Sequence, residues 1–263
     1  MLKLSRQAFY KHRQHCVAEE LQTEIIVQLV NQIRHRLPRV GGRKLYHMLQ
    51  SDFKLLPSKP GRDKFFAILR ENGLLVQPTR RYVSTTQSWH RFRVYTNLMR
   101  DRTVARANEA FVADITYIRL RDRFCYLFLV TDVYSRKIVG YKLSKDLTVD
   151  GALEAMKMAL RQVSSVNGLI HHSDRGFQYC CDEYVKLLHS HGIQISMGEV
   201  GNPYDNAIAE RVNGILKTEF FLNATFVNYN QAEDATAEAI SLYNDLRPHM
   251  SIGYMTPSVK YAA

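Results

Sequence analysis

The sequence has 263 residues, 46% of them hydrophobic, which excludes a largely disordered chain and suits a core domain joined to a smaller one. The longest apolar run is too short to span a bilayer and no signal peptide opens the sequence, so we expect a cytoplasmic protein with no membrane partner. The four cysteines form no C-x-x-C pair, which argues against structural zinc.

The net charge of +11 is distributed unevenly along the chain. Residues 1–105 carry 20 Lys and Arg against 7 Asp and Glu, whereas residues 106–263 carry 16 against 18. A basic front half joined to a near-neutral back half predicts a nucleic-acid-binding arm on a separate core. A generally basic protein of another kind is the alternative, and the asymmetry counts against it.

Apolar residues recur at helical spacing through the first 76 residues. Ser5 is a suitable N-cap for a first, short basic helix, and Gly73 is a good stop for the last one. The pattern predicts separate helices over residues 2–13, 18–37, 43–50 and 60–72.

Helices joined by short connections marked by Gly and Pro are typical of a helix-turn-helix-like DNA-binding region, which we assign to residues 1–76. Arg62 and Lys64 would then face a DNA groove from the last helix. An ordinary helical bundle fits the spacing equally well, and the surplus of basic residues favours DNA.

Residues 77–106 follow neither a helical nor a strand period and form a predicted basic linker. Its arginines alternate with Tyr, Trp and Phe, a composition that suits a segment following a phosphate backbone. A solvated linker that packs its aromatic rings onto the core is at least as common. The candidate DNA contacts in this segment are Arg80, Arg81, Arg91 and Arg93.

From residue 107 to the end the pattern changes to strands followed by alternating strands and helices. Such an order is typical of an α/β layer fold with a mixed sheet. Strands are predicted at residues 110–118, 124–134, 137–144, 168–172 and 193–197, and helices at 148–163, 182–191, from about 203, and 231–245.

Three carboxylates in this region are candidate catalytic residues. Asp114 interrupts an apolar strand, where a charge is costly unless a cation, hydrogen bonds or a metal compensates it. Asp174 follows a strand, at the end of the sheet where α/β proteins bind ligands. Glu210 would lie on the polar face of an amphipathic helix, opposite its buried side. Taken singly, each has an ordinary structural explanation.

Together the three carboxylates offer only hard oxygen donors, which suit two Mg²⁺ or Mn²⁺ ions. Such a pair of ions catalyses phosphodiester displacement by water or a 3′-hydroxyl. The competing carboxylates are Asp132, Asp205 and Glu219, of which Asp132 and Asp205 are interpreted as structural.

Five segments of the sequence resemble the integrase core of bacterial insertion-sequence-3 family transposases, and specifically their second-reading-frame (OrfB) product. Asp174 and Glu210 are separated by 35 residues, as in that family's D-D-35-E motif. The segments are "ADITYI", "YSRKIVGYKLS", "HSDRGFQY", "GNPYDNAIAERVNGILKTE" and "YNDLRPHMSIGYMTP".

The resemblance implies a ribonuclease H-like core, a mixed five-stranded sheet flanked by helices, over residues 107–263, with a helical tail at its C-terminus. Asp114, Asp174 and Glu210 would be the metal ligands of an enzyme that nicks and joins DNA. Further residues carry over with lesser roles: Lys217, Arg175 and Asn206 as DNA contacts, His172 and Thr116 as supports of the site.

The resemblance also implies partners. These are DNA, as terminal inverted repeats and target DNA, a second copy of the chain in a homo-oligomer on DNA, and the first-frame product of the same element, joined as a fusion. The protein would be associated with the bacterial nucleoid. A metal-dependent nuclease of the same fold and a non-catalytic DNA-binding regulator are the alternatives.

Overall fold

A computed structural model describes residues 6–77, 92–163, 165–199 and 206–263. The chain divides into two compact units, Met1–Pro78 and Thr79–Ala263. Within the described ranges, none of the helices combines the length and the apolar character that crossing a membrane would require.

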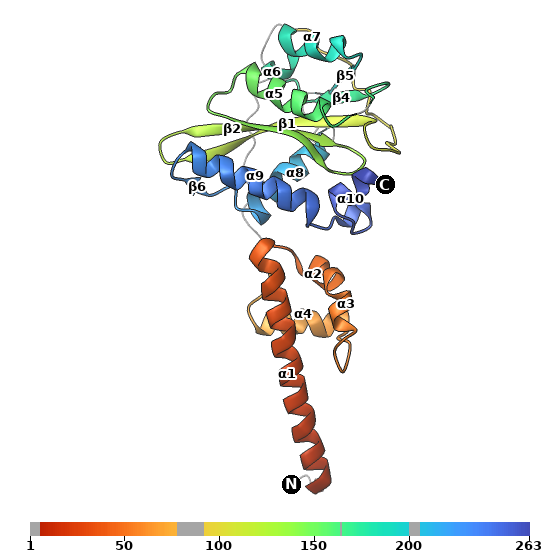
Figure 1. The fold of residues 1–263 in the computed structure, drawn as a ribbon, viewed down its shortest axis with the longest axis vertical. Helices are drawn as coiled ribbons and strands as arrows, with labels where there is room; N and C mark the ends of the chain where they lie inside the picture. The colour runs from red at the N-terminus through yellow and green to blue at the C-terminus, as the bar shows by residue number, and fades with distance from the viewer. Residues whose placement is uncertain (1–5, 78–91, 164, 200–205) are drawn as a thin grey trace. The chain divides into compact units, whose positions relative to one another are not determined.

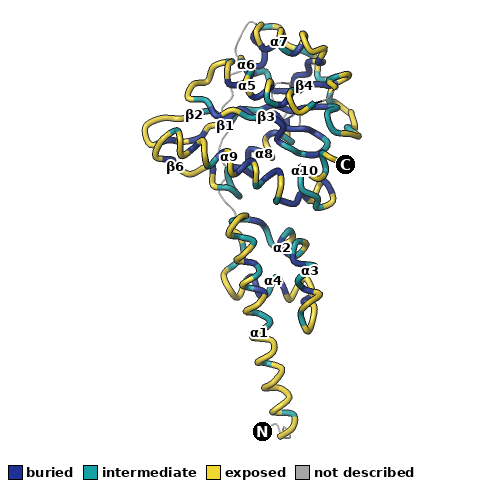
Figure 2. The backbone as a smooth tube through the Cα atoms, in the orientation of Figure 1, coloured by how far each residue is buried: buried dark blue, intermediate teal, exposed yellow. Residues whose placement is uncertain are grey.

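The first unit is entirely helical, and its core is formed by side chains such as Ile26, Leu45 and Phe65. Its helices are α1 (Arg6–Arg36), α2 (Gly42–Met48), α3 (Gln50–Phe53) and α4 (Arg62–Glu71). Figure 2 shows that burial is confined to the part of α1 that meets the other helices, and that its N-terminal half is exposed.

The prediction of separate helices over residues 2–13 and 18–37 was wrong, because α1 is one continuous helix of 31 residues. No Gly or Pro stands between the two predicted ranges, so nothing in the backbone interrupts the helix there. The predicted helix 43–50 is instead divided into α2 and α3, which meet at Leu49. The proposed cap, Ser5, lies outside the described residues.

The second unit is an α/β layer structure. Its strands are β1 (Ala110–Leu120), β2 (Phe124–Asp132), β3 (Ile138–Ser144), β4 (Ile170–Ser173), β5 (Gln194–Met197) and β6 (Thr225–Phe226). Its helices are α5 (Val149–Leu160), α6 (Phe177–Cys180), α7 (Asp182–Ser190), α8 (Ala207–Glu219), α9 (Tyr229–Asp245) and α10 (Pro257–Ala262), with a 3-10 turn at Met250–Ile252.

The strands form one mixed sheet in the order β3-β2-β1-β4-β5. β1 pairs with β2, and β2 with β3, in antiparallel fashion, whereas β4 is parallel to both β1 and β5. The five predicted strands and the mixed character of the sheet are thus confirmed. The two-residue strand β6, which pairs with the end of β1, was not predicted.

Helices cover both faces of the sheet, as Figure 1 shows. On one face, Phe111 and Ala113 of β1 share a core with residues of α5 and α7. On the other face, Ile118 and Leu120 share a second core with residues of α8 and α9. Because side chains alternate along a strand, Asp114 points to the same side as Ile118, where α8 lies.

Candidate active site

Asp114 lies on the central strand of the sheet, at the position where the neighbouring strand β4 ends. The last β1–β4 pair joins Ala113 to Ser173, so the next residues on the two parallel strands are Asp114 and Asp174. The register of two strands therefore brings together two carboxylates that are 60 residues apart in the sequence. β1 is not an edge strand, since it pairs with both β2 and β4, although the β4 pairing ends one residue before Asp114.

Asp174 begins the turn that leaves β4. Its Oδ1 accepts a hydrogen bond of 2.9 Å from the Gly176 N–H, which orders the turn before α6. Gly176 is also sterically restricted, since a Cβ there would approach Asp174 Oδ1 to 3.0 Å. The turn therefore holds the Asp174 carboxylate at the end of the sheet.

Glu210 lies in the first turn of α8 and is exposed. Val212, Ile215 and Leu216 are buried on the opposite side of the helix, as the amphipathic pattern predicted. The predicted helix start near Pro203 lies outside the described residues, and the described helix begins at Ala207.

The three carboxylates influence one another electrostatically. Burial, together with the charges of Asp174 and, to a lesser extent, Glu210, raises the pKa of Asp114 to about 7. Hydrogen bonds oppose this: the Ile115 N–H donates to Asp114 Oδ1 at 2.9 Å, and Asn213 Nδ2 donates to Oδ2 at 2.7 Å. A cation bound near the three carboxylates would relieve the repulsion that remains between them.

Two further observations describe this cluster. Burial lowers the pKa of Lys217, and the charge of Asp114 acts in the opposite direction, so this ammonium group lies within electrostatic range of the carboxylates. Among the described residues, no three His, Cys, Asp or Glu side chains are close enough together to hold one metal ion. The three carboxylates are therefore close to one another, but their side chains do not converge on a single metal position.

Asn213 was not identified as a site residue from the sequence, although it contacts Asp114 directly. It follows Glu210 by three residues on α8, and this spacing puts both on one side of a helix. Its amide oxygen, Oδ1, is buried and has no hydrogen-bond partner among the described residues. An unpartnered oxygen of this kind beside two carboxylates could accept a water or ligate a cation.

The predicted supporting residues line the same part of the sheet. Thr116 is buried on β1, two residues beyond Asp114 and on the same side of the strand. His172 Nδ1 lies 2.8 Å from Ser196 Oγ, which links β4 to β5. Arg175 Nε donates to the Gly198 carbonyl at 2.8 Å, and Asn206 Nδ2 donates to the Ala113 carbonyl at 3.3 Å.

The other predicted DNA contacts are distributed differently. In the first unit Arg62 pairs with the adjacent Asp63, and Lys64 Nζ lies 2.6 Å from Glu19 on α1. Arg93 packs over the Tyr95 ring, with its guanidinium carbon 5.2 Å from the ring centroid. Arg80, Arg81 and Arg91 lie outside the described residues.

The competing carboxylates have structural partners. Asp132 is fully buried and accepts hydrogen bonds from the Ser135 N–H, the Ser135 hydroxyl and the Asn108 N–H, so it stabilises the turn between β2 and β3. Glu219 receives two hydrogen bonds, of 2.6 and 2.8 Å, from the buried guanidinium of Arg247. Asp205 lies outside the described residues.

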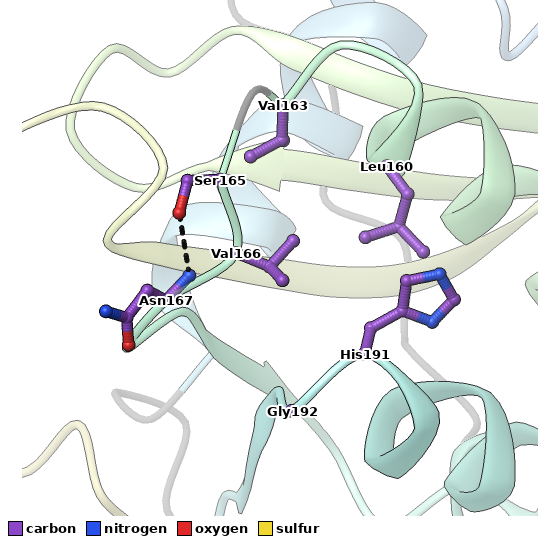
Figure 3. Close-up of a pocket in the computed structure, with 7 residues that line it drawn as sticks. All are labelled: Leu160, Val163, Ser165, Val166, Asn167, His191 and Gly192. Atoms are coloured by element: carbon purple, nitrogen blue, oxygen red, sulfur yellow. Dashed lines mark hydrogen bonds between the residues drawn. The ribbon is translucent and has the colours of Figure 1, made fainter.

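A surface hollow elsewhere on the second unit contains none of the three carboxylates (Figure 3). Leu160 from the end of α5, His191 and Gly192 after α7, and the loop that enters β4 line it. Asp174 lies at the other end of β4, so the hollow is separate from the carboxylate cluster. Its remaining lining residues are Val163, Ser165, Val166 and Asn167.

Comparison with known proteins identifies relatives of the second unit and of the whole chain. Residues 104–203 and 191–257 match two family models, each described as an integrase core domain. The chain is 33% identical over 259 residues to the insertion element IS600 uncharacterized 31 kDa protein of Shigella sonnei, a match that covers 97% of this chain and 94% of that one.

A second relative is the transposase InsF for insertion sequence IS3A of Escherichia coli (strain K12). It is 32% identical over 193 residues, which cover 73% of this chain and 67% of the relative. For the matching IS986/IS6110 proteins of mycobacteria, the match covers 56% of the relative's length.

Among solved structures, a chain in the cryoEM structure of the simian T-cell lymphotropic virus intasome in complex with PP2A regulatory subunit B56 gamma is similar. The TM-score is 0.51 at 19% identity, and the match covers 85% of this chain and 75% of that one. At this identity the likeness concerns the fold, which is that of a ribonuclease H-like core.

Proposed function

Because this chain belongs to the insertion-sequence-3 family of transposases, which carry an integrase core of the DDE superfamily, we propose that it nicks DNA at the ends of its own element and joins those ends to target DNA. The observation that carries the proposal is the register of β1 and β4, which makes Asp114 and Asp174 neighbours at the carboxyl end of β4. Glu210, the third carboxylate, is close enough to raise the pKa of Asp114.

We propose that Asp114, Asp174 and Glu210 bind two divalent ions, Mg²⁺ or Mn²⁺. The residues fit such ions, since they are hard oxygen donors, their mutual repulsion is only partly offset by hydrogen bonds, and Asn213 Oδ1 has no hydrogen-bond partner among the described residues. When bound, the ions would supply the Lewis acidity that activates the attacking oxygen and stabilises the leaving one.

The chain's own residues then have separate tasks. Asn213 orients the Asp114 carboxylate through the 2.7 Å hydrogen bond to Oδ2, and so fixes the direction in which the remaining lone pairs of the carboxylate can bind a cation. Lys217, on the same helix as Asn213 and within electrostatic range of Asp114, supplies a positive charge for a DNA phosphate. Arg175, which follows Asp174, and Asn206, which precedes α8, extend this contact with DNA.

For the whole molecule we propose that residues 1–76 bind the terminal inverted repeats, that residues 77–106 follow the DNA backbone, and that residues 107–263 perform the chemistry. The surplus of basic residues in the first 105 positions supports this division. Bringing two element ends together requires at least two copies of the chain. The first-frame product, joined as a fusion, is the proposed additional partner.

The test is a Mg²⁺-dependent assay of cleavage and strand transfer on DNA that carries the element's ends. Asp174→Asn removes one negative ligand while keeping the shape of the side chain, so we expect DNA binding to persist and both nicking and joining to be lost. Asp182→Asn, an exposed aspartate at the start of α7, is the matched control and should retain activity.

The outcomes distinguish the alternatives. Cleavage retained by Asp174→Asn contradicts the assignment of the carboxylates. Cleavage of arbitrary DNA by the unaltered chain without any joining would indicate a metal-dependent nuclease. DNA binding with no cleavage under any divalent ion would indicate a non-catalytic regulator.

A further inference from the structure

Within the described residues, no helix covers one face of the sheet beyond α5, at the hairpin that joins β1 to β2. Register pairs Tyr117 with Tyr126 and Arg119 with Phe124, so these four side chains lie on one face. The same face continues to Phe128, which pairs with Lys142 of β3 and contacts Gly151 at the start of α5. Helix α5 therefore covers the face up to Phe128. The hairpin face beyond it comprises Tyr117, Arg119, Phe124, Tyr126 and Lys142.

The aromatic rings of the hairpin face are in contact with one another and open to solvent. Tyr117 packs edge to face against Phe124 and Tyr126, with ring centroids 6.0 and 5.2 Å apart. Tyr117 is 38% exposed and Phe124 41% exposed, although aromatic side chains of this size are usually buried. A contiguous exposed aromatic cluster on a sheet is a feature of binding surfaces.

The charge around these rings is positive. The guanidinium carbon of Arg119 lies 5.1 Å from the centroid of the Phe124 ring. The hairpin and the adjacent end of β3 carry five cations against two acids, Asp122 and Asp146, a surplus of three. The cations are Arg119, Arg121, Arg123, Lys142 and Lys145, and all five are exposed. An anionic partner that also presents flat, apolar surfaces complements this combination.

The hairpin face lies close to the carboxylate cluster along the same strand. Tyr117 is three residues beyond Asp114 on β1, a separation of about 10 Å at the usual rise of a strand, and the odd spacing puts the two side chains on opposite faces of the sheet. β4 ends at Ser173, so among the described residues no strand pairs with the β1 edge between Asp114 and the β6 pairing at Arg119. A single strand that leaves the carboxylates would reach the hairpin face by passing around this edge.

From these observations we propose that the hairpin face binds unpaired bases of a DNA strand, which stack on Tyr117 and Phe124 while Arg119 and Lys142 bind the adjoining phosphates. Aromatic rings among cations form the usual binding surface for single strands, since every base offers a π-face. In a duplex the flat faces of the bases are covered by their neighbours, so the face selects DNA that is melted or frayed. This role rests on the proposed function only in assigning the strand to the carboxylate site.

Photocrosslinking tests the contact directly. The full chain is mixed, in EDTA, with a single-stranded oligonucleotide containing 5-bromodeoxyuridine, irradiated and digested with trypsin. We expect crosslinks on the peptide 107–119, which contains Tyr117, and on 124–136, which contains Phe124 and Tyr126. Crosslinks confined to other peptides overturn the proposal.

A pair of double variants separates stacking from folding. Tyr117→Thr/Phe124→Thr keeps β-forming residues but removes the rings, and should weaken single-strand binding about tenfold or more, with duplex binding unchanged. Tyr117→Phe/Phe124→Tyr keeps both rings and should bind as the unaltered chain does. Thermal melting of both variants establishes that they fold.

Three results overturn the proposal. The folded Thr double variant could bind single strands as tightly as the unaltered chain does, or it could lose duplex binding as much as single-strand binding. It could also keep its DNA binding but lose the mass of a dimer in sedimentation. The last result would assign the face to a second copy of the chain. Because these measurements are made in EDTA, they involve no cleavage. The proposal for the hairpin face can therefore be refuted while Asp174→Asn still abolishes cleavage. If instead the hairpin variants behave as expected and Asp174→Asn still cleaves, only the proposed function is refuted.

Discussion

The neighbours of Asp114 determine how readily this carboxylate ionises inside the sheet. Its two hydrogen bonds come from Ile115 and Asn213, yet burial together with the charge of Asp174 still raises its pKa to about 7. At neutral pH the metal-free group is therefore partly protonated. A cation binds only the ionised form, so cation binding and proton release are coupled at this residue.

The hydrogen bond from Asn213 leads to a prediction for activity and its pH dependence. Asn213→Ala should reduce the rate of strand cleavage by roughly tenfold to a hundredfold, the range for a bond to a charged group, with DNA affinity retained. The bond lowers the pKa of Asp114, so its loss raises that pKa. The acidic limb of the pH–rate profile should move to higher pH.

A purely structural role for Asn213 would produce a different result. It would lower the melting temperature and the rate together, and the acidic limb would stay where it is in the unaltered chain. Asn213→Ser, whose hydroxyl can still donate to water near the carboxylate, should lose less activity than Asn213→Ala. Measured rates at limiting Mg²⁺ across pH 5–9 are the appropriate data, since there the protonation of Asp114 competes most strongly with cation binding.

The sequence was sufficient to select Asp114 and Asp174 as candidates, because an acidic residue in an apolar strand or just after one is conspicuous. Glu210 was selected by its place on the polar face of an amphipathic helix and by its 35-residue separation from Asp174. It was not sufficient to find Asn213 as the partner of Asp114. These two residues are 99 positions apart. Their contact depends on how α8 crosses β1, and no local pattern encodes that crossing.

At the scale of elements, the contact between α5 and the sheet depends on a glycine in β3. A Cβ added to Gly140 would lie 2.0 Å from the Ala155 carbonyl oxygen and 3.0 Å from the Ala159 Cβ, both on α5. The helix can lie this close to the sheet only because position 140 has no side chain. The small residues Ala152, Ala155 and Ala159 complete this interface.

Gly140→Ala should therefore destabilise the second unit by roughly 1–3 kcal/mol, the usual cost of overpacking, because α5 must move away from the sheet. Gly214→Ala in α8 is the matched control: nothing lies within 4 Å of the added Cβ, so helix propensity should leave stability unchanged or slightly raised. Denaturant unfolding of both variants measures the difference. Equal stability of Gly140→Ala and the unaltered chain would show that α5 can shift without cost.

Prediction of the elements succeeded where one period persists over many residues and failed at their ends and junctions. The strands that became β1 to β5 were recognised because they are apolar runs bounded by turns. The continuous helix α1 was divided in two because its exposed N-terminal half, with Phe9 and Val17 at the surface, lacks an apolar stripe matching the rest. The two residues of β6 carry too little pattern to be recognised at all.

At the scale of the whole molecule, the carboxylate cluster lies in the second unit, whereas the surplus of basic residues in positions 1–105 extends over both units. The compact units divide between residues 78 and 79, so residues 79–105, with 6 Lys and Arg against 1 Asp and Glu, belong to the same unit as the carboxylates. The division of roles, with DNA binding by residues 1–76 and chemistry by residues 107–263, stays a prediction. The sheet register that makes Asp114 and Asp174 neighbours could not be read from the sequence, because register depends on long-range pairing.

The most direct test of the central claim, that these carboxylates bind the catalytic cations, is a change of metal preference in the full chain. Asp174→Cys replaces a hard oxygen ligand by a thiolate, which binds Mg²⁺ poorly and softer ions well. On element-end DNA, this variant should be inactive with Mg²⁺ and regain strand cleavage with Mn²⁺ or Cd²⁺. Unreduced cleavage with Mg²⁺, or a folded, DNA-binding variant that no thiophilic ion restores, would contradict the claim.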